Sequence, residues 1–83
     1  MTTHRELRIL YYAVFREATG LSEETVRSAA PTAADLYLEI SRTYGIPYDL
    51  SMLTVALNDQ VVPWSSPLGD GDTVVFLAPF AGG

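Results

Sequence analysis

The chain has 83 residues, which is the length of a single domain, 1–83, built around one core. It contains no cysteine and one histidine, His4, which excludes a disulfide framework, a zinc site made of side chains and a Ser-His-Asp triad. The formal net charge of −5, with five arginines and no lysine, opposes binding to nucleic acid or to an anionic membrane.

The first part of the chain predicts two strands. Residues 1–6 are polar and are expected to be frayed. The apolar, β-rich segment Leu7–Val14 predicts the first strand, and Phe15–Gly20 is expected to leave it as a loop. The weakly alternating segment Ser22–Ala30 predicts a short edge strand that pairs with the first strand as a hairpin.

One helix is expected next, over Ala33–Tyr44. Thr32 is a good N-cap residue, and Asp35 three positions later resembles a capping box. Gly45 is well placed for the left-handed residue that ends a helix. The apolar residues that recur at helical spacing, and that we expect to pack on the sheet, are Ala33, Leu36, Tyr37, Ile40 and Tyr44.

The second half predicts three further strands. The expected elements are a strand over Leu53–Leu57, a two-residue turn at Asn58–Asp59, a short strand over Gln60–Val62, a loop over Pro63–Leu68, a tight turn over Gly69–Asp72 and a last strand over Thr73–Leu77. The first and last strands are the most apolar, so they are expected side by side at the centre. The fold class is therefore α+β in two layers, and a parallel central pair would make it a mixed β-grasp, or ubiquitin-like, sheet.

The C-terminal tail, residues 78–83, is the strongest functional signal, and we expect it to be flexible. It consists of Ala78, Pro79, Phe80, Ala81, Gly82 and Gly83. Fully extended, the last five residues reach roughly 17 Å, which is long enough to enter another protein's active site. The Gly83 carboxylate is inert at neutral pH and must be activated, for example with ATP. The chain has no phosphate-binding loop, so a partner must supply that step. A frayed terminus or a cloning scar is the alternative interpretation.

Strand alternation also predicts an apolar patch on the sheet face that the helix leaves open. Its expected members are Leu10, Tyr12, Val75 and Leu77, with Val61 as a further candidate. The open face of a half-buried sheet is normally polar, so such a patch indicates a partner interface. The loop over Pro63–Leu68 or a second copy of the chain could cover it instead. Arg16 could join an interfacial ion pair with Glu17, or both could be solvated.

The remaining candidate sites have simpler interpretations. Asp70 and Asp72 in a glycine-rich turn lack the ligand series of a calcium loop, so we expect a plain turn and no metal. Trp64 is expected to anchor its loop on the core. No apolar run is long enough to span a membrane and no signal peptide is evident, so we expect a soluble, cytoplasmic protein.

Four segments together resemble the ThiS/MoaD family of ubiquitin-like sulfur carriers, and its MoaD branch in particular. They are LYYAVFRE at Leu10–Glu17 followed by Gly20, the helix start at Pro31–Thr32, ALN at Ala56–Asn58, and PLGDGDTVVFLAPFAGG from Pro67 to Gly83. The last segment is the most specific, because a DGD turn, a strand, a proline-containing lead and a terminal Gly-Gly occur in order.

The resemblance implies a β-grasp fold and a carrier with no active site and no bound cofactor of its own. An ATP-using adenylating enzyme would activate Gly83, and a sulfurtransferase would convert it to a thiocarboxylate. The tail would then donate sulfur inside the large subunit of molybdopterin synthase, for molybdenum cofactor biosynthesis. Tyr12, Val61 and Leu77 match family positions on the partner surface. Phe80 departs from the family pattern, which often has a second proline and a smaller residue in the tail.

Three alternatives stay open at this point. The same chemistry could serve another pathway, such as thiamine or cysteine synthesis. The chain could be a ubiquitin-like modifier that forms isopeptides on target lysines. It could also be a plain interaction module with an inert tail. The lack of lysine means that the chain cannot form polymers on its own side chains, which disfavours a polymerising modifier.

Overall fold

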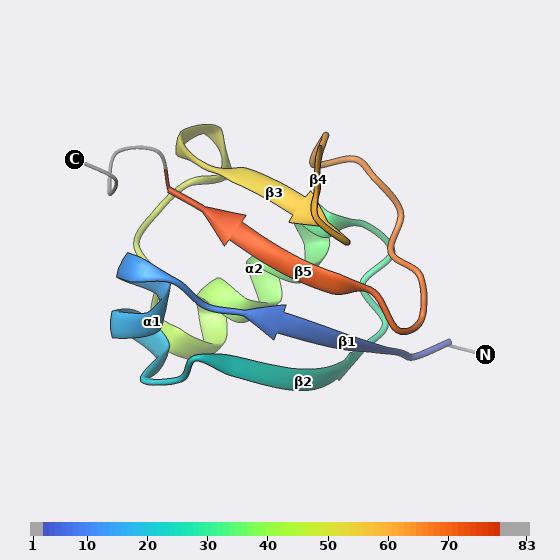
Figure 1. The fold of residues 1–83 in the computed structure, drawn as a ribbon, viewed down its shortest axis with the longest axis horizontal. Coiled ribbons are helices and arrows are strands. Elements are labelled where there is room, and N and C mark those ends of the chain that lie inside the picture. Colours follow the sequence, from blue (N-terminus) through green and yellow to red (C-terminus); the bar gives the residue numbers. More distant parts are fainter. Residues whose placement is uncertain (1–2, 79–83) are drawn as a thin grey trace.

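A computed structural model describes residues 3–78, and these form a five-stranded sheet with two helices (Figure 1). The elements are β1 (Arg5–Leu10), α1 (Ala13–Thr19), β2 (Glu23–Ser28), α2 (Ala33–Tyr44), the 3₁₀ turn η1 (Leu50–Met52), β3 (Thr54–Leu57), β4 (Gln60–Val62) and β5 (Thr73–Leu77). The strand order is β2-β1-β5-β3-β4. The central strands β1 and β5 are parallel and the other pairs are antiparallel, which confirms the predicted α+β, mixed β-grasp sheet.

Helix α2 has the predicted limits because both of its caps form. The Thr32 hydroxyl oxygen accepts a hydrogen bond from the backbone N–H of Asp35 at 3.3 Å. The same hydroxyl donates to the Asp35 carboxylate at 2.7 Å. Gly45 follows the helix with φ 65°, a left-handed conformation that favours glycine. The predicted turn Asn58–Asp59 also forms, with positive φ at both residues.

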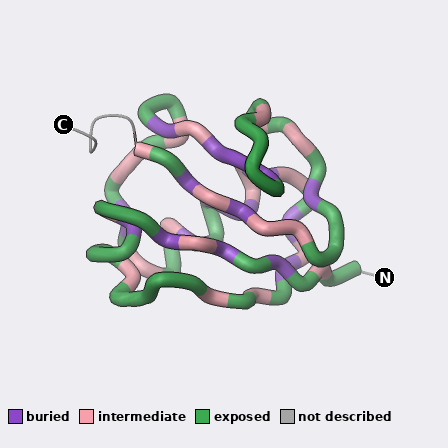
Figure 2. The backbone as a smooth tube through the Cα atoms, viewed as in Figure 1, coloured by how far each residue is buried: buried purple, intermediate pink, exposed green. Residues whose placement is uncertain are grey.

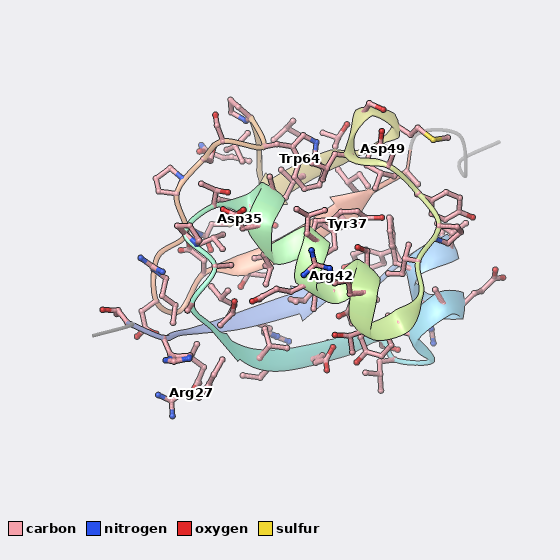
Figure 3. The ribbon with its side chains drawn as sticks, turned by 180° about the vertical axis from the view of Figure 1, so that it is seen from behind. Arg27, Asp35, Tyr37, Arg42, Asp49 and Trp64 are labelled. Atoms are coloured by element: carbon pink, nitrogen blue, oxygen red, sulfur yellow. The ribbon has the colours of Figure 1, made fainter. Side chains whose placement is uncertain are left out.

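The core lies between the sheet and α2, which covers one sheet face (Figure 3). Along the strands, buried residues alternate with residues that are partly or fully exposed (Figure 2). Leu36 and Ile40 from α2 share one apolar cluster with Ile9 and Phe76 from the two central strands, as predicted. Trp64 stacks on Phe76 with ring centroids 6.1 Å apart and donates a hydrogen bond to the Leu53 carbonyl, which confirms that it anchors its loop.

The first strand was predicted wrongly at both ends. It ends at Leu10, not at Val14, and Phe15–Gly20 is not a loop, because Ala13–Thr19 form helix α1. Phe15 is 1% exposed and packs its ring against Tyr37, Tyr48 and Phe76. A helix of seven residues is too short to show a repeating apolar stripe, so only the packing of Phe15 reveals it. Gly20 is the left-handed residue that ends α1, with φ 76°.

The start of β1 is also ordered further than expected. Arg5 and Glu6 belong to the strand, because Arg5 pairs with Ser28 of β2 and the backbone N–H of Glu6 donates to the Asp70 carboxylate at 2.7 Å. Residues 1–2 lie outside the described part of the chain. The edge strand β2 pairs antiparallel with β1 as predicted, although helix α1 replaces the expected hairpin loop between them.

Candidate functional site

The sheet face away from α2 carries an apolar row that strand register places there. Val75 pairs with Leu10 on one side and with Ala56 on the other, and Ala56 pairs with Val61. Directly paired residues point to the same face of a sheet, so these four side chains form one row across four strands. Val61 is 68% exposed, although it is a large apolar residue.

Leu77 and Tyr12 lie at the end of the sheet where β5 finishes. Leu77 is the last residue of β5 and is 37% exposed, and Tyr12 is the N-cap of α1 and is 55% exposed. Tyr11 is buried in the core and Tyr12 has an extended backbone, so the alternation of an extended chain turns the Tyr12 side chain toward the open face.

These residues define what we call the open patch. Its members are Leu10, Tyr12, Ala56, Val61, Val75 and Leu77. The structure therefore places together the apolar residues that the sequence predicted for a partner interface. Arg16 is exposed on α1 and forms no ion pair within residues 3–78.

Two features of this surface were not predicted. Ala56 belongs to the open patch, and strand alternation could have found it, because Val55 and Leu57 on either side of it belong to the core. Met52, in η1, is 49% exposed and lies two residues before Thr54, the partner of Leu77 in the sheet. No sequence signal marks Met52, because a 3₁₀ turn of three residues has no apolar period.

The loop over Pro63–Leu68 does not cover the open patch. It lies against the start of α2, where Ala33 and Ala34 donate backbone hydrogen bonds to the carbonyls of Ser66 and Trp64 at 3.1 and 3.0 Å. Leu68 donates in turn to the Pro31 carbonyl. The alternative in which this loop shields the patch is therefore wrong.

The chain leaves the sheet beside the open patch. Ala78 follows β5 and packs partly against the core. The rest of the tail, with Pro79, Phe80, Ala81, Gly82 and Gly83, lies outside the described residues, and its predicted roles stay predictions. The structure shows where the tail begins, because β5 ends at the same end of the sheet as Tyr12 and α1 (Figure 1).

The turn that precedes β5 is held by its own carboxylates. Asp72 accepts hydrogen bonds from the Gly69 backbone N–H at 2.7 Å and from the Asn58 side-chain amide at 2.9 Å, while Asp70 accepts from Glu6. This confirms the plain turn expected for Asp70 and Asp72. Among residues 3–78 no cluster of His, Cys, Asp or Glu side chains is arranged to hold a metal ion.

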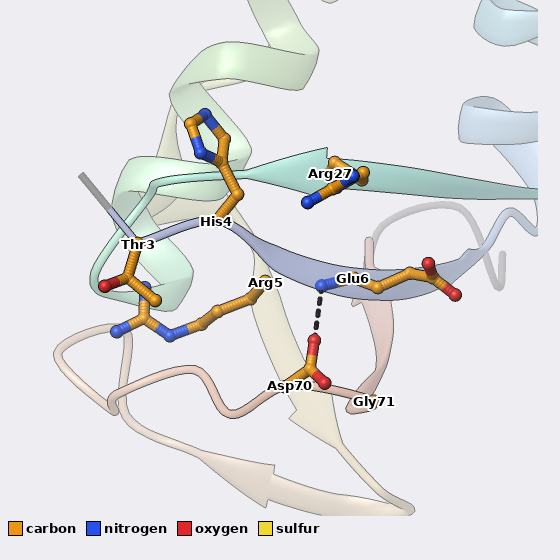
Figure 4. Close-up of a pocket in the computed structure, with 7 residues that line it drawn as sticks. All are labelled: Thr3, His4, Arg5, Glu6, Arg27, Asp70 and Gly71. Carbon is orange, nitrogen blue, oxygen red and sulfur yellow. Dashed lines mark hydrogen bonds between the residues drawn. The ribbon is translucent and has the colours of Figure 1, made fainter. Parts of the chain in front are cut away.

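A polar hollow lies at the other end of β1 (Figure 4). It measures about 670 Å³ and is lined by Thr3, His4, Arg5, Glu6, Arg27, Asp70 and Gly71. Its two arginines are matched by two carboxylates, so with His4 neutral it offers no net charge to a ligand.

Neither helix in the described part of the chain has the length and apolar character needed to cross a membrane.

Known proteins resemble this chain over nearly all of its length. Residues 9–83 match the ThiS family. The chain is 30% identical over 80 residues to the molybdopterin synthase sulfur carrier subunit of Escherichia coli (strain K12), covering 93% of this chain and 99% of that protein.

Two solved structures are similar to the fold described above. A putative molybdopterin converting factor, subunit 1, from Pyrococcus furiosus has 26% identity and a TM-score of 0.74, covering 89% of this chain and 97% of that one. The small archaeal modifier protein 1 from Methanosarcina acetivorans has 19% identity and a TM-score of 0.76, covering 98% and 99%, and shows likeness of fold alone. The family match and the Escherichia coli relative show that the chain belongs to the ThiS family, as its motifs predicted.

Proposed function

We propose that this protein is the sulfur carrier of a molybdopterin synthase and that its reactive group is the C-terminal carboxylate of Gly83. The observation that carries the proposal is the 30% identity to the Escherichia coli sulfur carrier subunit, which extends over 99% of that subunit. The Gly82–Gly83 terminus and the open patch beside the start of the tail support it.

The proposed chemistry needs no catalytic side chain in this protein. In an adenylating partner, an oxygen of the Gly83 carboxylate would attack the α-phosphate of ATP, which forms an acyl-adenylate and releases pyrophosphate. A persulfide on a sulfurtransferase would then attack the acyl carbon with its outer sulfur and displace AMP, which gives an acyl disulfide. A second thiol would attack the carrier sulfur of that disulfide, forming a disulfide with the carrier and leaving a thiocarboxylate on Gly83. Because the chain has no lysine and no cysteine, it presents no side-chain amine or thiol to compete for its own activated end.

In the proposal, the thiocarboxylate acts inside the large subunit of molybdopterin synthase. Its sulfur would attack the pterin precursor, and hydrolysis of the resulting acyl–sulfur bond would return the Gly83 carboxylate. The open patch is the surface proposed to dock on that subunit, because burying exposed apolar side chains such as Val61 and Tyr12 favours association. Glycine at the last two positions leaves no Cβ to obstruct a narrow channel.

The test is to incubate the full chain with an adenylating enzyme, ATP and a sulfur donor, and to weigh the intact protein. We expect the mass gain of one oxygen replaced by one sulfur, located at Gly83, and then molybdopterin formation with a large subunit. A variant with one residue added after Gly83 is expected to fail in both steps, because the extra residue moves the carboxylate by about 3.4 Å. The matched control carries one added residue before Met1 and is expected to behave as the wild type.

Other results would assign the chain elsewhere. An extended variant that still gains sulfur, with its extension intact, would show that Gly83 is not the reactive residue. Sulfur gain without molybdopterin formation would point to another pathway, such as thiamine or cysteine synthesis. Gly-Gly remnants on lysines of other proteins would indicate a modifier, a role that the fold shared with the small archaeal modifier protein makes worth testing.

A further inference from the structure

The turn η1 lies beside the end of β5, on the side away from β1. Thr54, which follows η1, is the sheet partner of Leu77, the last residue of β5. On the other side, β1 runs parallel to β5 with Leu10 beside Val75, so the chain that continues from β1 brings Tyr12 beside Leu77. The point where the chain leaves the sheet is therefore flanked by Tyr12 and by η1, the yellow turn before β3 (Figure 1).

Backbone alternation turns the Met52 side chain of η1 toward the open face. Leu53 follows η1 with an extended backbone, φ −126° and ψ 165°, and its side chain lies in the core. In an extended chain the residues on either side of Leu53 point the opposite way, and Thr54 shares the open face with its partner Leu77. Met52 is 49% exposed, so it extends the open patch to the far side of the point where the tail begins.

Met52 differs chemically from the members of the open patch, because its side chain holds a thioether sulfur. A lone pair of this sulfur can attack one oxygen of hydrogen peroxide. The O–O bond then breaks, the oxygen stays on the sulfur as a sulfoxide, and water leaves, so that the sulfur is oxidised and the peroxide is reduced. The chain has no cysteine to compete for the oxidant, and Met52 is one of only two methionines.

The exposure of Met52 decides which property the sulfoxide would change. In the free protein a sulfoxide at an exposed position keeps its contact with water, so the fold loses little. In a docked complex the same group would be desolvated beside apolar side chains, which costs free energy unless it finds a hydrogen-bond donor. Oxidation of Met52 is therefore expected to act on association and not on folding.

We propose that Met52 is a reversible oxidation site that controls docking of the open patch. The inference rests on the proposed function, which supplies the partner, the large subunit of a molybdopterin synthase. As a thioether, Met52 would pack on that subunit beside Leu77, and as a sulfoxide it would weaken the contact. A methionine sulfoxide reductase would reverse the change, because thiols are oxidised to a disulfide while the sulfoxide oxygen leaves as water.

The experiment oxidises the full chain with hydrogen peroxide, removes the peroxide and measures binding to the large subunit by calorimetric titration. The chain is used in its carboxylate form, because a thiocarboxylate would itself react with peroxide. Mass mapping of peptides locates the added oxygen. We expect oxidation at Met52 to weaken binding at least tenfold with an unchanged melting temperature. Treatment with reductases for both sulfoxide epimers is expected to restore the affinity.

Two variants separate the sulfur from the side chain that carries it. Met52→Leu keeps an apolar side chain of similar volume, so it is expected to bind within about threefold of the wild type. It is expected to keep that affinity after peroxide treatment, although Met1 is still present to be oxidised. Met52→Gln is polar without any oxidant and is expected to weaken binding at least tenfold, which tests the inference even where oxidation unfolds the wild type.

The outcomes distinguish this inference from the proposed function. Oxidised wild type that binds as tightly as before, a Met52→Gln chain that binds normally, or a Met52→Leu chain that loses affinity after oxidation would each overturn this inference alone. Sulfur gain at Gly83 and docking of the untreated chain would be unaffected by those results. An untreated chain that gains no sulfur and does not bind the large subunit would overturn the proposed function and this inference with it.

Discussion

The two faces of the sheet are both apolar along β5, but only one of them is buried in the core. On the face covered by α2, Val74 and Phe76 are 0% and 1% exposed and lie in the core. On the open face, Leu77 keeps 37% of its surface exposed and Val75 is only partly buried. Core packing explains the first pair and not the second. Apolar residues that folding leaves exposed are available for association with a partner.

The open face is itself divided. The part formed by β2 and the first residues of β1 is polar, with Arg8 and Glu23 paired at 2.8 Å between two exposed side chains and Thr25 beside them. The rest, from Leu10 across β5 to β3 and β4, holds the open patch. A sheet face that contacts only water is normally polar, as the part at β2 is. The apolar part is the exception, which indicates that it has a function.

The largest effect is expected on the covered face. Phe76→Ala is expected to lower the free energy of unfolding by about 3–5 kcal/mol, because it removes a ring that packs against Phe15, Tyr37 and Trp64. Denaturant unfolding measures it. Leu77→Ala, the next residue on the other face, is the matched control and is expected to cost less than about 1 kcal/mol. Equal losses at both positions would remove the distinction between the faces.

The open face gives the opposite expectation. Leu77→Asp is expected to leave the circular dichroism spectrum and the melting temperature nearly unchanged. It is expected to weaken binding to the proposed partner, the large subunit of a molybdopterin synthase, by about 3 kcal/mol or more, since an unpaired charge would be buried at the interface. Calorimetric titration checks this. Thr25→Asp, on the polar part of the same face, should bind as the wild type does. A folded Leu77→Asp chain that still binds would show that the open patch is not the interface.

The covered face also carries a polar cluster that makes stability depend on pH. The Tyr11 and Tyr44 hydroxyls both donate to the Glu24 carboxylate, at 2.7 and 2.8 Å. The pKa of Tyr11 is raised mainly by burial and secondly by its hydrogen bond to Glu24. The pKa of Tyr44 is raised mainly by its hydrogen bond to Glu24. Because the unfolded chain loses these protons first, stability is independent of them below pH 10.0, the ordinary tyrosine value, and falls above it.

This alkaline loss can be measured by unfolding the protein at a series of pH values. Tyr11→Phe removes one of the two titrating groups, so its stability is expected to fall less steeply above pH 10.0. Met52→Ala, an exposed position that carries no titrating group, is the control and should follow the wild type. Identical slopes for all three proteins would mean that the Glu24 cluster does not govern the alkaline limit.

The smallest effect is expected at the cap of the covering helix. Thr32→Ala removes the hydroxyl that holds Asp35 and is expected to cost about 1 kcal/mol of stability with no change in partner binding. Thr32→Ser keeps the hydroxyl and should lose only a fraction of that amount. Thermal unfolding of the two variants measures the difference. A loss of partner binding in Thr32→Ala would show that the two faces are coupled through α2.

Local sequence determined the elements whose signals are complete within a few residues. Helix α2 was predicted to the residue because its N-cap, its apolar stripe and its terminal glycine all agree. The Asn58–Asp59 turn and strand β5 followed from turn chemistry and from β-branched content. The alternation of the first and last strands also predicted correctly that Leu10 and Val75 point away from the core, which is why the open patch could be predicted before its geometry was known.

Only the tertiary structure decided the direction and register of the central strand pair and where the first strand stops. The apolar content of the first and last strands predicted that they are neighbours, but no local pattern specifies that β1 and β5, at opposite ends of the chain, run parallel. Helix α1 exists because Phe15 fits among Tyr37, Tyr48 and Phe76, residues that lie far from it in sequence. The row from Leu10 to Val61 likewise depends on register across four strands. Long-range packing, not local propensity, sets all three, because their free energy comes from contacts that form only in the folded chain.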